Sequence, residues 1–282
     1  MVIISPSYLD LGGITLTALE ASGVQWITET VDGWEGSPSS TLKGVQRPRG
    51  HGSWAGNAYF TERSVAAAGR VFAPTAALLS DAIDRLNNAV ALDDQVLTVT
   101  ESGRTRHCVV RRAGDVISST TDLVAAWSIQ VVSLDPRKLG ATKTASTQLP
   151  STSGGLTVPF TVPFSIDATQ VSGQVMLTNS GNTAGPVTAR IDGPCVGPVV
   201  THKGANGGAL VFAASLVLGA GEWLDIDYGK RQVLANGQAS RNGYITARGW
   251  STFEPGANTW SFTAASYTAG AQLTITATSA DK

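Results

Sequence analysis

The chain has 282 residues, of which 42% are hydrophobic and only 15% are charged, and 31 are glycine. A charged fraction below the usual value of about 25% favours turns and buried sheets over long solvated helices. The 20 Lys and Arg side chains nearly balance the 21 Asp and Glu side chains, which argues against a surface dedicated to nucleic acid or anionic membranes. Domains average about 150 residues, so the length predicts two domains.

The start of the chain, Met1–Pro6, carries neither a basic segment nor a long apolar one, so we expect no signal peptide. The longest apolar run, Ala209–Ala220, is shorter than the about 20 residues that span a bilayer. We therefore expect synthesis in a cytoplasm, where Cys108 and Cys195 are thiols. Two cysteines this far apart exclude a disulfide-rich scaffold and a thiolate zinc site.

A long segment from Gly33 to Ser53 is rich in Gly, Pro and Ser, and such segments inside a domain are usually functional or disordered. Its aromatic residues argue against plain disorder. Ordering such a backbone with little burial is costly in entropy, so we expect this loop to be mobile in an isolated subunit. Because Trp and Arg dominate interface hot spots, we expect it to order against a neighbouring subunit or ring. The candidate interface residues are Trp34, Arg47, Arg49, His51 and Trp54.

One helix is predicted, and it begins at Pro74–Thr75 and ends near Asn87–Asn88. Its apolar residues follow at spacings of four, three and four, namely Leu79, Ile83, Leu86 and Val90. Beyond it, Leu97–Thr100 and His107–Val110 predict a hairpin, and Trp127–Val131 predicts a further strand.

The composition changes after Arg137. Residues 139–155 are mostly Ser, Thr, Gly and Ala, which is typical of a linker, so we place the domain boundary near residue 145. Short strands separated by glycine turns follow without helices, which predicts an antiparallel sandwich. The expected strands include Val175–Leu177, Val187–Ile191, Leu210–Phe212, Leu224–Tyr228, Trp260–Phe262 and Leu273–Thr276.

The sequence offers few catalytic groups. His51 could act as a general base, but no nucleophile motif accompanies it, and a local hydrogen-bonding role is the simpler interpretation. His107 and Cys108 are adjacent in a predicted strand, so their side chains point to opposite faces. His202 is isolated, and the Gly204–Gly208 segment predicts a hairpin turn because no helix follows to make a phosphate loop.

Three other clusters each allow two interpretations. Asp225 and Asp227 share a strand face and could hold a cation or act as a carboxylate pair, or could simply be solvated. A basic cluster (Arg104, Arg106, Arg111 and Arg112) could bind nucleic acid or pair with acids at an interface, and the absence of interleaved aromatics favours the second. The aromatic side chains of the second half could stack on sugar rings or pack in a core. They are Trp223, Tyr244, Trp250 and Trp260.

An ordered series of short motifs resembles one family, the distal tail proteins of siphophages, which are bacteriophages with long non-contractile tails. The first half carries Trp34–Pro38, Arg47–Ser53 and Gly69–Phe72 before the helix. The second half carries Leu177–Ala184, Pro186–Val187, Ile191–Pro194, Gly221–Asp227 and Phe253–Phe262. Their succession covers nearly the whole chain.

The resemblance implies a mainly β protein without an active site. Residues 1–143 would form a tail-tube-like barrel or sandwich domain with one α-helix, and residues 150–282 a galectin-like antiparallel β-sandwich. It also implies a homohexameric ring at the virion tail tip, in contact with the tail tube protein, the tape measure protein and the tail-tip or receptor-binding proteins. No catalytic, cofactor-binding or metal-binding residues are expected. The alternative is a carbohydrate-binding β-sandwich module for attachment to a host surface.

Overall fold

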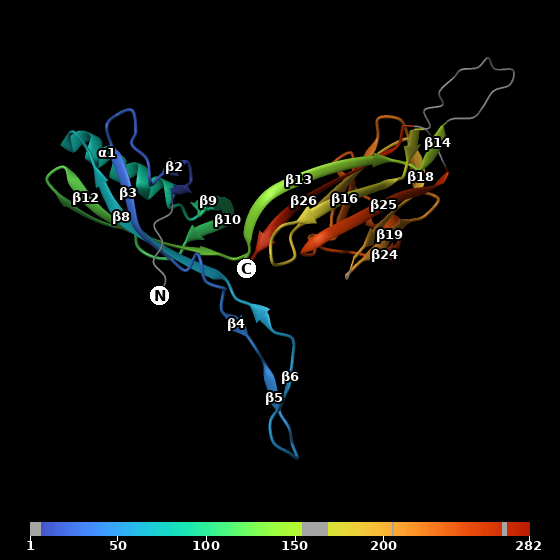
Figure 1. Ribbon diagram of the computed structural model, residues 1–282, viewed down its shortest axis with the longest axis horizontal. Helices are drawn as coiled ribbons and strands as arrows, with labels where there is room; N and C mark the ends of the chain where they lie inside the picture. Colours follow the sequence, from blue (N-terminus) through green and yellow to red (C-terminus); the bar gives the residue numbers. More distant parts are fainter. Residues whose placement is uncertain (1–6, 154–168, 205, 267–269) are drawn as a thin grey trace, which may run out of the picture. The chain divides into compact units, whose positions relative to one another are not determined.

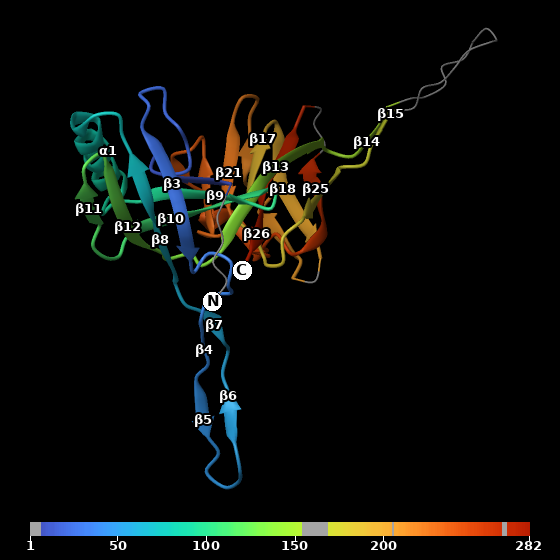
Figure 2. The ribbon, with the colours of Figure 1, turned by 60° about the vertical axis from the view of Figure 1, so that its left-hand side comes forward.

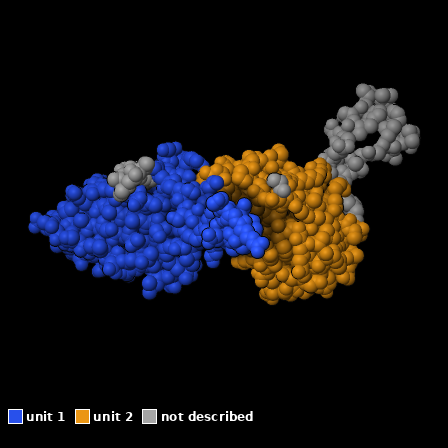
Figure 3. All heavy atoms as spheres, turned by 90° about the horizontal axis from the view of Figure 1, so that it is seen from below, with its two compact units in different colours: residues 1–140, 282 blue, residues 141–281 orange. Residues whose placement is uncertain are grey.

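The computed structural model describes residues 7–153, 169–204, 206–266 and 270–282. The chain divides into two compact units, unit 1 (residues 1–140 with residue 282) and unit 2 (residues 141–281), which Figure 3 colours separately. Each unit has its own cluster of buried apolar side chains. Both are built mainly from antiparallel strands.

Unit 1 contains twelve strands and one helix among its described residues. They are β1 (Tyr8–Leu11), β2 (Ile14–Thr15), β3 (Gln25–Asp32), β4 (Ser40–Thr41), β5 (Gly44–Gln46), β6 (Ser53–Ala55), β7 (Tyr59–Phe60), β8 (Arg63–Phe72), α1 (Ala76–Ala89), β9 (Gln95–Glu101), β10 (Arg104–Arg112), β11 (Ile117–Thr121) and β12 (Val124–Ser133). The strand β13 (Lys138–Gln148) begins at the end of this unit and continues into unit 2.

The core of unit 1 is formed in part by the inward-facing side chains of a sheet. In this sheet β3, β8, β12 and β11 pair in that order, and β12 also pairs with β10. Side chains on β8 and β12 alternate between buried and exposed, as the period of two in a strand requires. Trp26 and Trp127 meet edge to face in this core, with ring centroids 6.4 Å apart. The strands β2, β1, β9 and β10 pair in succession beside them.

The single helix confirms the sequence prediction. Thr75 caps its N-terminus by accepting a hydrogen bond from the Leu78 backbone N–H at 3.3 Å. Leu79 and Leu86 are buried against the strands, as the apolar spacing indicates. The predicted hairpin is also confirmed, because β9 and β10 pair with Leu97 opposite Cys108.

Unit 2 is a sandwich of two antiparallel sheets (Figures 1 and 2). One sheet has the order β13-β26-β17-β21-β22-β23, and the other has the order β16-β25-β18-β19-β24, with β20 paired to β18. The bounds are β14 (Ser151–Ser153), β15 (Thr169–Val171), β16 (Gln174–Asn179), β17 (Val187–Asp192), β18 (Cys195–Lys203), β19 (Gly208–Phe212), β20 (Val217–Leu218), β21 (Trp223–Asp227), β22 (Gln232–Ala235), β23 (Ala239–Ser240), the 3-10 turn η1 (Asn242–Tyr244), β24 (Ile245–Arg248), β25 (Gly256–Ser266) and β26 (Gln272–Asp281).

The linker predicted over residues 139–155 is wrong for most of its length. Residues 138–148 form β13, which pairs with β26, and residues 151–153 form β14, which pairs with β15. Thr142 and Thr144 meet Thr278 and Thr276 across the β13–β26 pair, with hydroxyl oxygens 2.8 and 3.1 Å apart. The small polar side chains of this segment therefore belong to the solvent-exposed face of a sheet and not to a linker. Residues 154 and 155 lie outside the described residues.

Candidate interface arm

Residues 36–61 form an extended ribbon, called the arm here, which runs out from unit 1 between β3 and β8 (Figures 1 and 2). Near its root β4 pairs with β7, and farther out β5 pairs with β6, with Val45 opposite Trp54. The predicted loop is thus a β-hairpin over much of its length. Turn-rich composition concealed these short strands.

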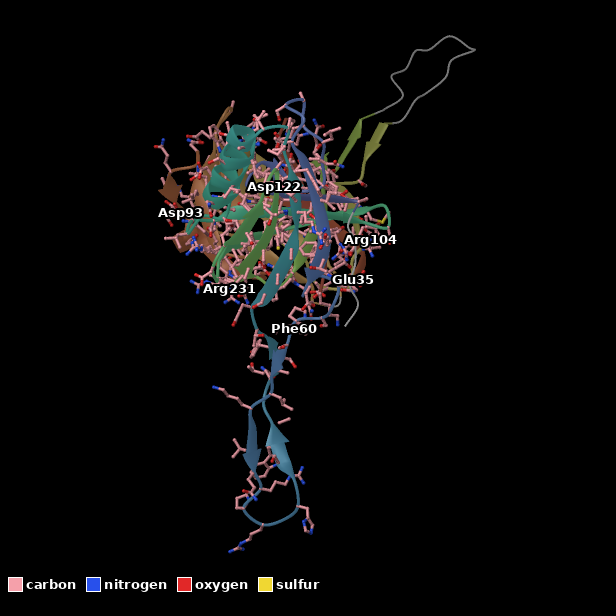
Figure 4. All side chains as sticks on the ribbon, turned by 90° about the vertical axis from the view of Figure 1, so that its left-hand side faces the viewer. Glu35, Phe60, Asp93, Arg104, Asp122 and Arg231 are labelled. Atoms are coloured by element: carbon pink, nitrogen blue, oxygen red, sulfur yellow. The ribbon has the colours of Figure 1, made fainter. Side chains whose placement is uncertain are left out.

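The arm exposes large apolar side chains on a surface that has no core beneath it. Trp54 is 57% exposed and Tyr59 is 66% exposed, and Leu42, Val45 and Phe60 are exposed as well. Figure 4 shows side chains standing free along both legs beyond Phe60. An isolated two-stranded hairpin is marginally stable in water at best, so this ribbon needs a surface to pack against.

Charge distinguishes the arm from the rest of its unit. The arm carries three basic side chains, Lys43, Arg47 and Arg49, and no Asp or Glu, whereas the remainder of residues 1–140 carries nine basic and fourteen acidic side chains. The arm is therefore positive and the body of unit 1 is negative.

The root of the arm is fixed by Arg63, a buried arginine that is 2% exposed. Its Nη1 donates to the backbone carbonyl oxygens of Gly33, Trp34 and Gly36, at 2.8, 3.0 and 2.8 Å. Its Nε donates to the Pro136 carbonyl oxygen at 2.9 Å. Burial lowers the pKa of the Arg63 guanidinium below its usual value.

A second buried cation, Lys138, also binds the chain at the root of the arm. Lys138 Nζ donates to the Trp34 carbonyl oxygen at 3.0 Å and lies 5.8 Å from the centre of the Trp34 ring. Because Arg63 opens β8 and Lys138 opens β13, the two cations hold the incoming leg of the arm against both strands. These bonds hold the residues from which the arm leaves unit 1.

The structure separates the five sequence-predicted interface residues. Arg47, Arg49, His51 and Trp54 all lie exposed on the outer part of the arm. Trp34 does not, because its side chain is 0% exposed in the core of unit 1. The interpretation of Trp34 as an exposed anchor was wrong, and its role is to fill the core beneath the root. Arg63 and Lys138 were missed because their partners are distant in sequence.

The histidines do not assemble a catalytic group. His107 is partly buried on β10, and Cys108 points to the opposite face into the core, where burial raises the pKa of its thiol to about 11. His202 is buried against Trp260 with ring centroids 4.5 Å apart, and its Nε2 lies 3.0 Å from Asn258 Oδ1. Burial lowers the pKa of both histidines.

Each carboxylate of the acidic pair on β21 interacts with a neighbouring side chain. Asp225 accepts a hydrogen bond from Trp223 Nε1 at 2.9 Å, and Asp227 lies 3.5 Å from Lys230 Nζ. Both face a hollow of about 440 Å³ on the outer face of the sheet. Among the described residues, no three His, Cys, Asp or Glu side chains gather closely enough to hold a metal ion.

The remaining candidate clusters also have local partners. Arg106, Arg111 and Arg112 pair with acids of unit 1, namely Glu101, Asp94 and Asp115. In unit 2, Trp260 is fully buried, and the guanidinium carbon of Arg190 lies 4.4 Å from the centre of the Trp223 ring. Tyr244 is exposed and Trp250 is half-buried. Within the described parts of the chain, no helix is both long and apolar enough to cross a membrane.

No protein-family model matches the chain, and no curated protein matches it. Among solved structures, it is similar to the SPP1 Dit protein, described as a paradigm of hub adsorption apparatus in phages that infect Gram-positive hosts. The match covers 97% of this chain and 98% of that one, with 14% identity and a TM-score of 0.63. The chain has the fold of SPP1 Dit. A chain of the phage P2 baseplate in its activated, Ca-containing conformation matches with 11% identity and a TM-score of 0.48, over 98% of each chain.

The likeness to SPP1 Dit confirms the fold that the motif series implied, a mainly β chain with one helix and two successive β parts. The correspondence extends over both units, since almost the full length of each chain is covered. At 14% identity the likeness concerns the backbone, so the roles of individual side chains rest on the contacts described above.

Proposed function

We propose that this protein is a structural hub of a bacteriophage tail tip, or baseplate, and not an enzyme. The observation that carries the proposal is the full-length likeness to SPP1 Dit, a protein described as a hub of an adsorption apparatus. The surface of unit 1 supports it, because an exposed apolar and basic arm suits a protein that functions in an assembly.

The finer proposal is a homohexameric ring that joins the tail tube to the tip proteins. In this ring the arm of one copy packs on the negative body of unit 1 of another copy. A contact between two different surfaces is heterologous, and heterologous contacts close into rings when the rotation permits. The tail tube protein, the tape measure protein and the tail-tip or receptor-binding proteins are the proposed neighbours, in a virion whose proteins are made in the host cytoplasm.

The assembly is tested by native mass spectrometry and negative-stain electron microscopy of the purified chain. We expect a particle of several subunits with a central hole, whose assembly weakens as salt is raised because the arm contact is partly electrostatic. A strictly monomeric chain at all accessible protein concentrations, including in the presence of a tail tube, would refute the hub.

The role of the arm is tested with two variants. Replacing residues 37–61 with a Gly-Ser linker, or combining Arg47→Glu with Arg49→Glu, should lower the solution mass or block tube joining while circular dichroism stays unchanged. The matched control combines Lys203→Glu with Arg241→Glu, two basic side chains of unit 2. Normal rings and normal tail assembly from the shortened chain would show that the arm is a passive insertion.

The alternative function, a carbohydrate-binding module, requires an aromatic face that a sugar ring can reach. Of the four candidate aromatic side chains, Trp260 is buried and cannot be reached by a sugar, and Arg190 covers one face of Trp223. Binding of neutral oligosaccharides by a monomeric chain would favour this alternative over the ring. Hydrolysis of polysaccharide that disappears in Asp225→Asn or Asp227→Asn would instead favour an enzyme.

A further inference from the structure

A second hollow in unit 2 lies where the last strands of its two sheets meet. The strands β22 and β23 end one sheet, β24 ends the other, and the turn η1 connects them. The hollow has a volume of about 360 Å³, which falls in the range of small-molecule sites. Its lining consists of Arg231, Asn242, Ile245, Arg248 and Trp250.

The charge around this hollow is one-sided. From Gly229 to Phe253 the chain carries four basic side chains and no Asp or Glu. Lys230 is paired with Asp227, but within the described parts of the chain neither Arg231 nor Arg248 has a carboxylate partner. Two guanidinium groups therefore line one hollow without a counter-charge, unlike Arg190, which donates to Asp192 at 2.8 Å.

The backbone holds Arg231 in an unusual conformation. Its φ angle is +53°, in the left-handed region that residues other than glycine rarely adopt. The Asn242 side chain secures it, since Nδ2 donates to the Arg231 carbonyl oxygen at 2.9 Å and Oδ1 accepts from the Val233 N–H at 2.7 Å. Asn242 therefore holds the backbone here, and the two guanidinium groups are the charged donors among the lining residues.

The remaining wall of the hollow is apolar. Trp250 meets Tyr228 edge to face, with ring centroids 5.9 Å apart, and both Trp250 and Ile245 pack partly against the core of unit 2. Their uncovered surfaces line the hollow beside the arginines. A ligand that fits must therefore combine an anionic group with a body that can lie against an indole ring.

We propose that this hollow binds the phosphate ester of a sugar or polyol. Arg231 and Arg248 hold the phosphate through charge-assisted hydrogen bonds, and Trp250 and Ile245 contact the carbon skeleton. Two planar guanidinium forks suit the several acceptor oxygens and the charge of a phosphate. A strand of nucleic acid would need a longer basic track with several stacking platforms, which this compact hollow does not offer. The proposal is independent of ring assembly.

Binding is tested on the full-length chain by isothermal titration calorimetry with five probes. We expect saturable binding of glucose 6-phosphate and glycerol 3-phosphate, weaker binding of inorganic phosphate, and no binding of glucose. Raising the salt concentration should weaken the binding. Absence of binding by both esters at millimolar concentrations would overturn the proposal. Tighter binding of glucuronate than of glucose 6-phosphate would overturn the assignment to phosphate.

Variants locate the site. Arg231→Asn keeps a residue type that tolerates the left-handed conformation, and combined with Arg248→Gln it should weaken ester binding by about tenfold or more, because the charge-assisted bonds are lost. Arg248→Lys keeps the charge without the fork and should give an intermediate loss. Arg190→Gln, which removes a paired arginine of the same unit, is the control and should not alter binding. Equal affinity in the double variant and the control would refute the site.

Discussion

Arg63 shows how one residue can determine where a long surface segment leaves a domain. Its four donated hydrogen bonds reach carbonyl oxygens at positions 33, 34, 36 and 136, so a side chain at the start of β8 binds the other leg of the arm and the approach to β13. No sequence motif identifies such an arginine, because its partners lie 27 to 73 residues away along the chain.

Replacing Arg63 tests this role. Arg63→Met relieves the burial of a charge but removes the side-chain donor of the Gly33, Gly36 and Pro136 carbonyl oxygens. The Trp34 carbonyl oxygen keeps Lys138 Nζ as a donor. We therefore expect a net loss of about 2–4 kcal/mol in the free energy of unfolding. Urea denaturation followed by tryptophan fluorescence measures it, since Trp34 lies under the root. Arg63→Lys should retain part of the stability, and an unchanged unfolding midpoint in Arg63→Met would contradict the role of Arg63 as a clamp.

His202 gives unit 2 a predictable response to pH. Its pKa in the folded state is lowered by burial from the usual 6.5, so the unfolded chain binds the proton more readily. The associated stability is fully present above pH 6.5 and is lost as the pH falls below that value. His107 in unit 1, whose pKa burial also lowers, acts in the same direction.

The measurement is the urea midpoint of unfolding at pH 7.5 and at pH 5.0. We expect the midpoint to be lower at pH 5.0 and the difference to shrink in His202→Gln. His51→Gln on the exposed arm is the matched control and should retain the full difference. A difference of the same size in His202→Gln would show that other groups cause it.

At the scale of elements, the sheet of unit 1 depends on a close approach at Gly69 of β8. A Cβ atom placed there would lie 2.0 Å from the Ile27 carbonyl oxygen and 2.8 Å from Cζ2 of Trp127. The register between β3 and β8 shifts beside this point, between Thr28 and Thr30. The missing side chain allows the indole ring and the neighbouring strand to lie against the backbone.

We therefore expect Gly69→Ala to destabilise unit 1 by about 3 kcal/mol, because both obstructing groups belong to packed strands that cannot move freely. The measurement is the free energy of unfolding from urea titration. Gly36→Ala is the control, since open space surrounds a Cβ there. Equal stability of the two variants would contradict the packing described for β8.

The elements differ in how well the sequence predicts them. Alternating apolar residues predicted β9, β12, β17, β21 and β26, and the spacing with the Thr75 cap predicted α1. The strand β13 was missed because the Ala141–Gln148 segment pairs threonines across strands instead of burying large side chains. Trp34 was misjudged because its Gly- and Pro-rich neighbours suggest a surface, whereas its side chain packs in the core of unit 1 and its carbonyl oxygen accepts from Arg63 and Lys138.

At the scale of the whole molecule, the strand β13 determines where we place the start of the second domain. The expected domain start at residue 150 would remove β13 from the edge of β26, together with the partly buried Ala145 and the buried Leu149 that belong to the core. We propose instead that the autonomous second domain begins with β13, at residue 138. The free edge of β26 would otherwise be open to pairing with other chains.

Two fragments test the boundary. A fragment of residues 138–282 should unfold cooperatively, whereas one of residues 150–282 should unfold at lower urea concentration or aggregate, because it lacks an edge strand and part of the core. Size-exclusion chromatography and urea denaturation compare them. The same midpoint and solubility for both fragments would restore the boundary near residue 150.

The connection between the arm and β8 has a mechanical consequence. The outgoing leg of the arm continues through residue 62 into β8, which pairs with β12 along its whole length and with β3 over residues 66–72. A pull along the arm therefore loads two ladders of backbone hydrogen bonds in shear, so that many bonds must yield together, whereas peeling would break them one at a time. The Arg63 clamp joins the second leg to the same strand. Unit 1 should therefore resist a pulling force at the point where the exposed arm joins it.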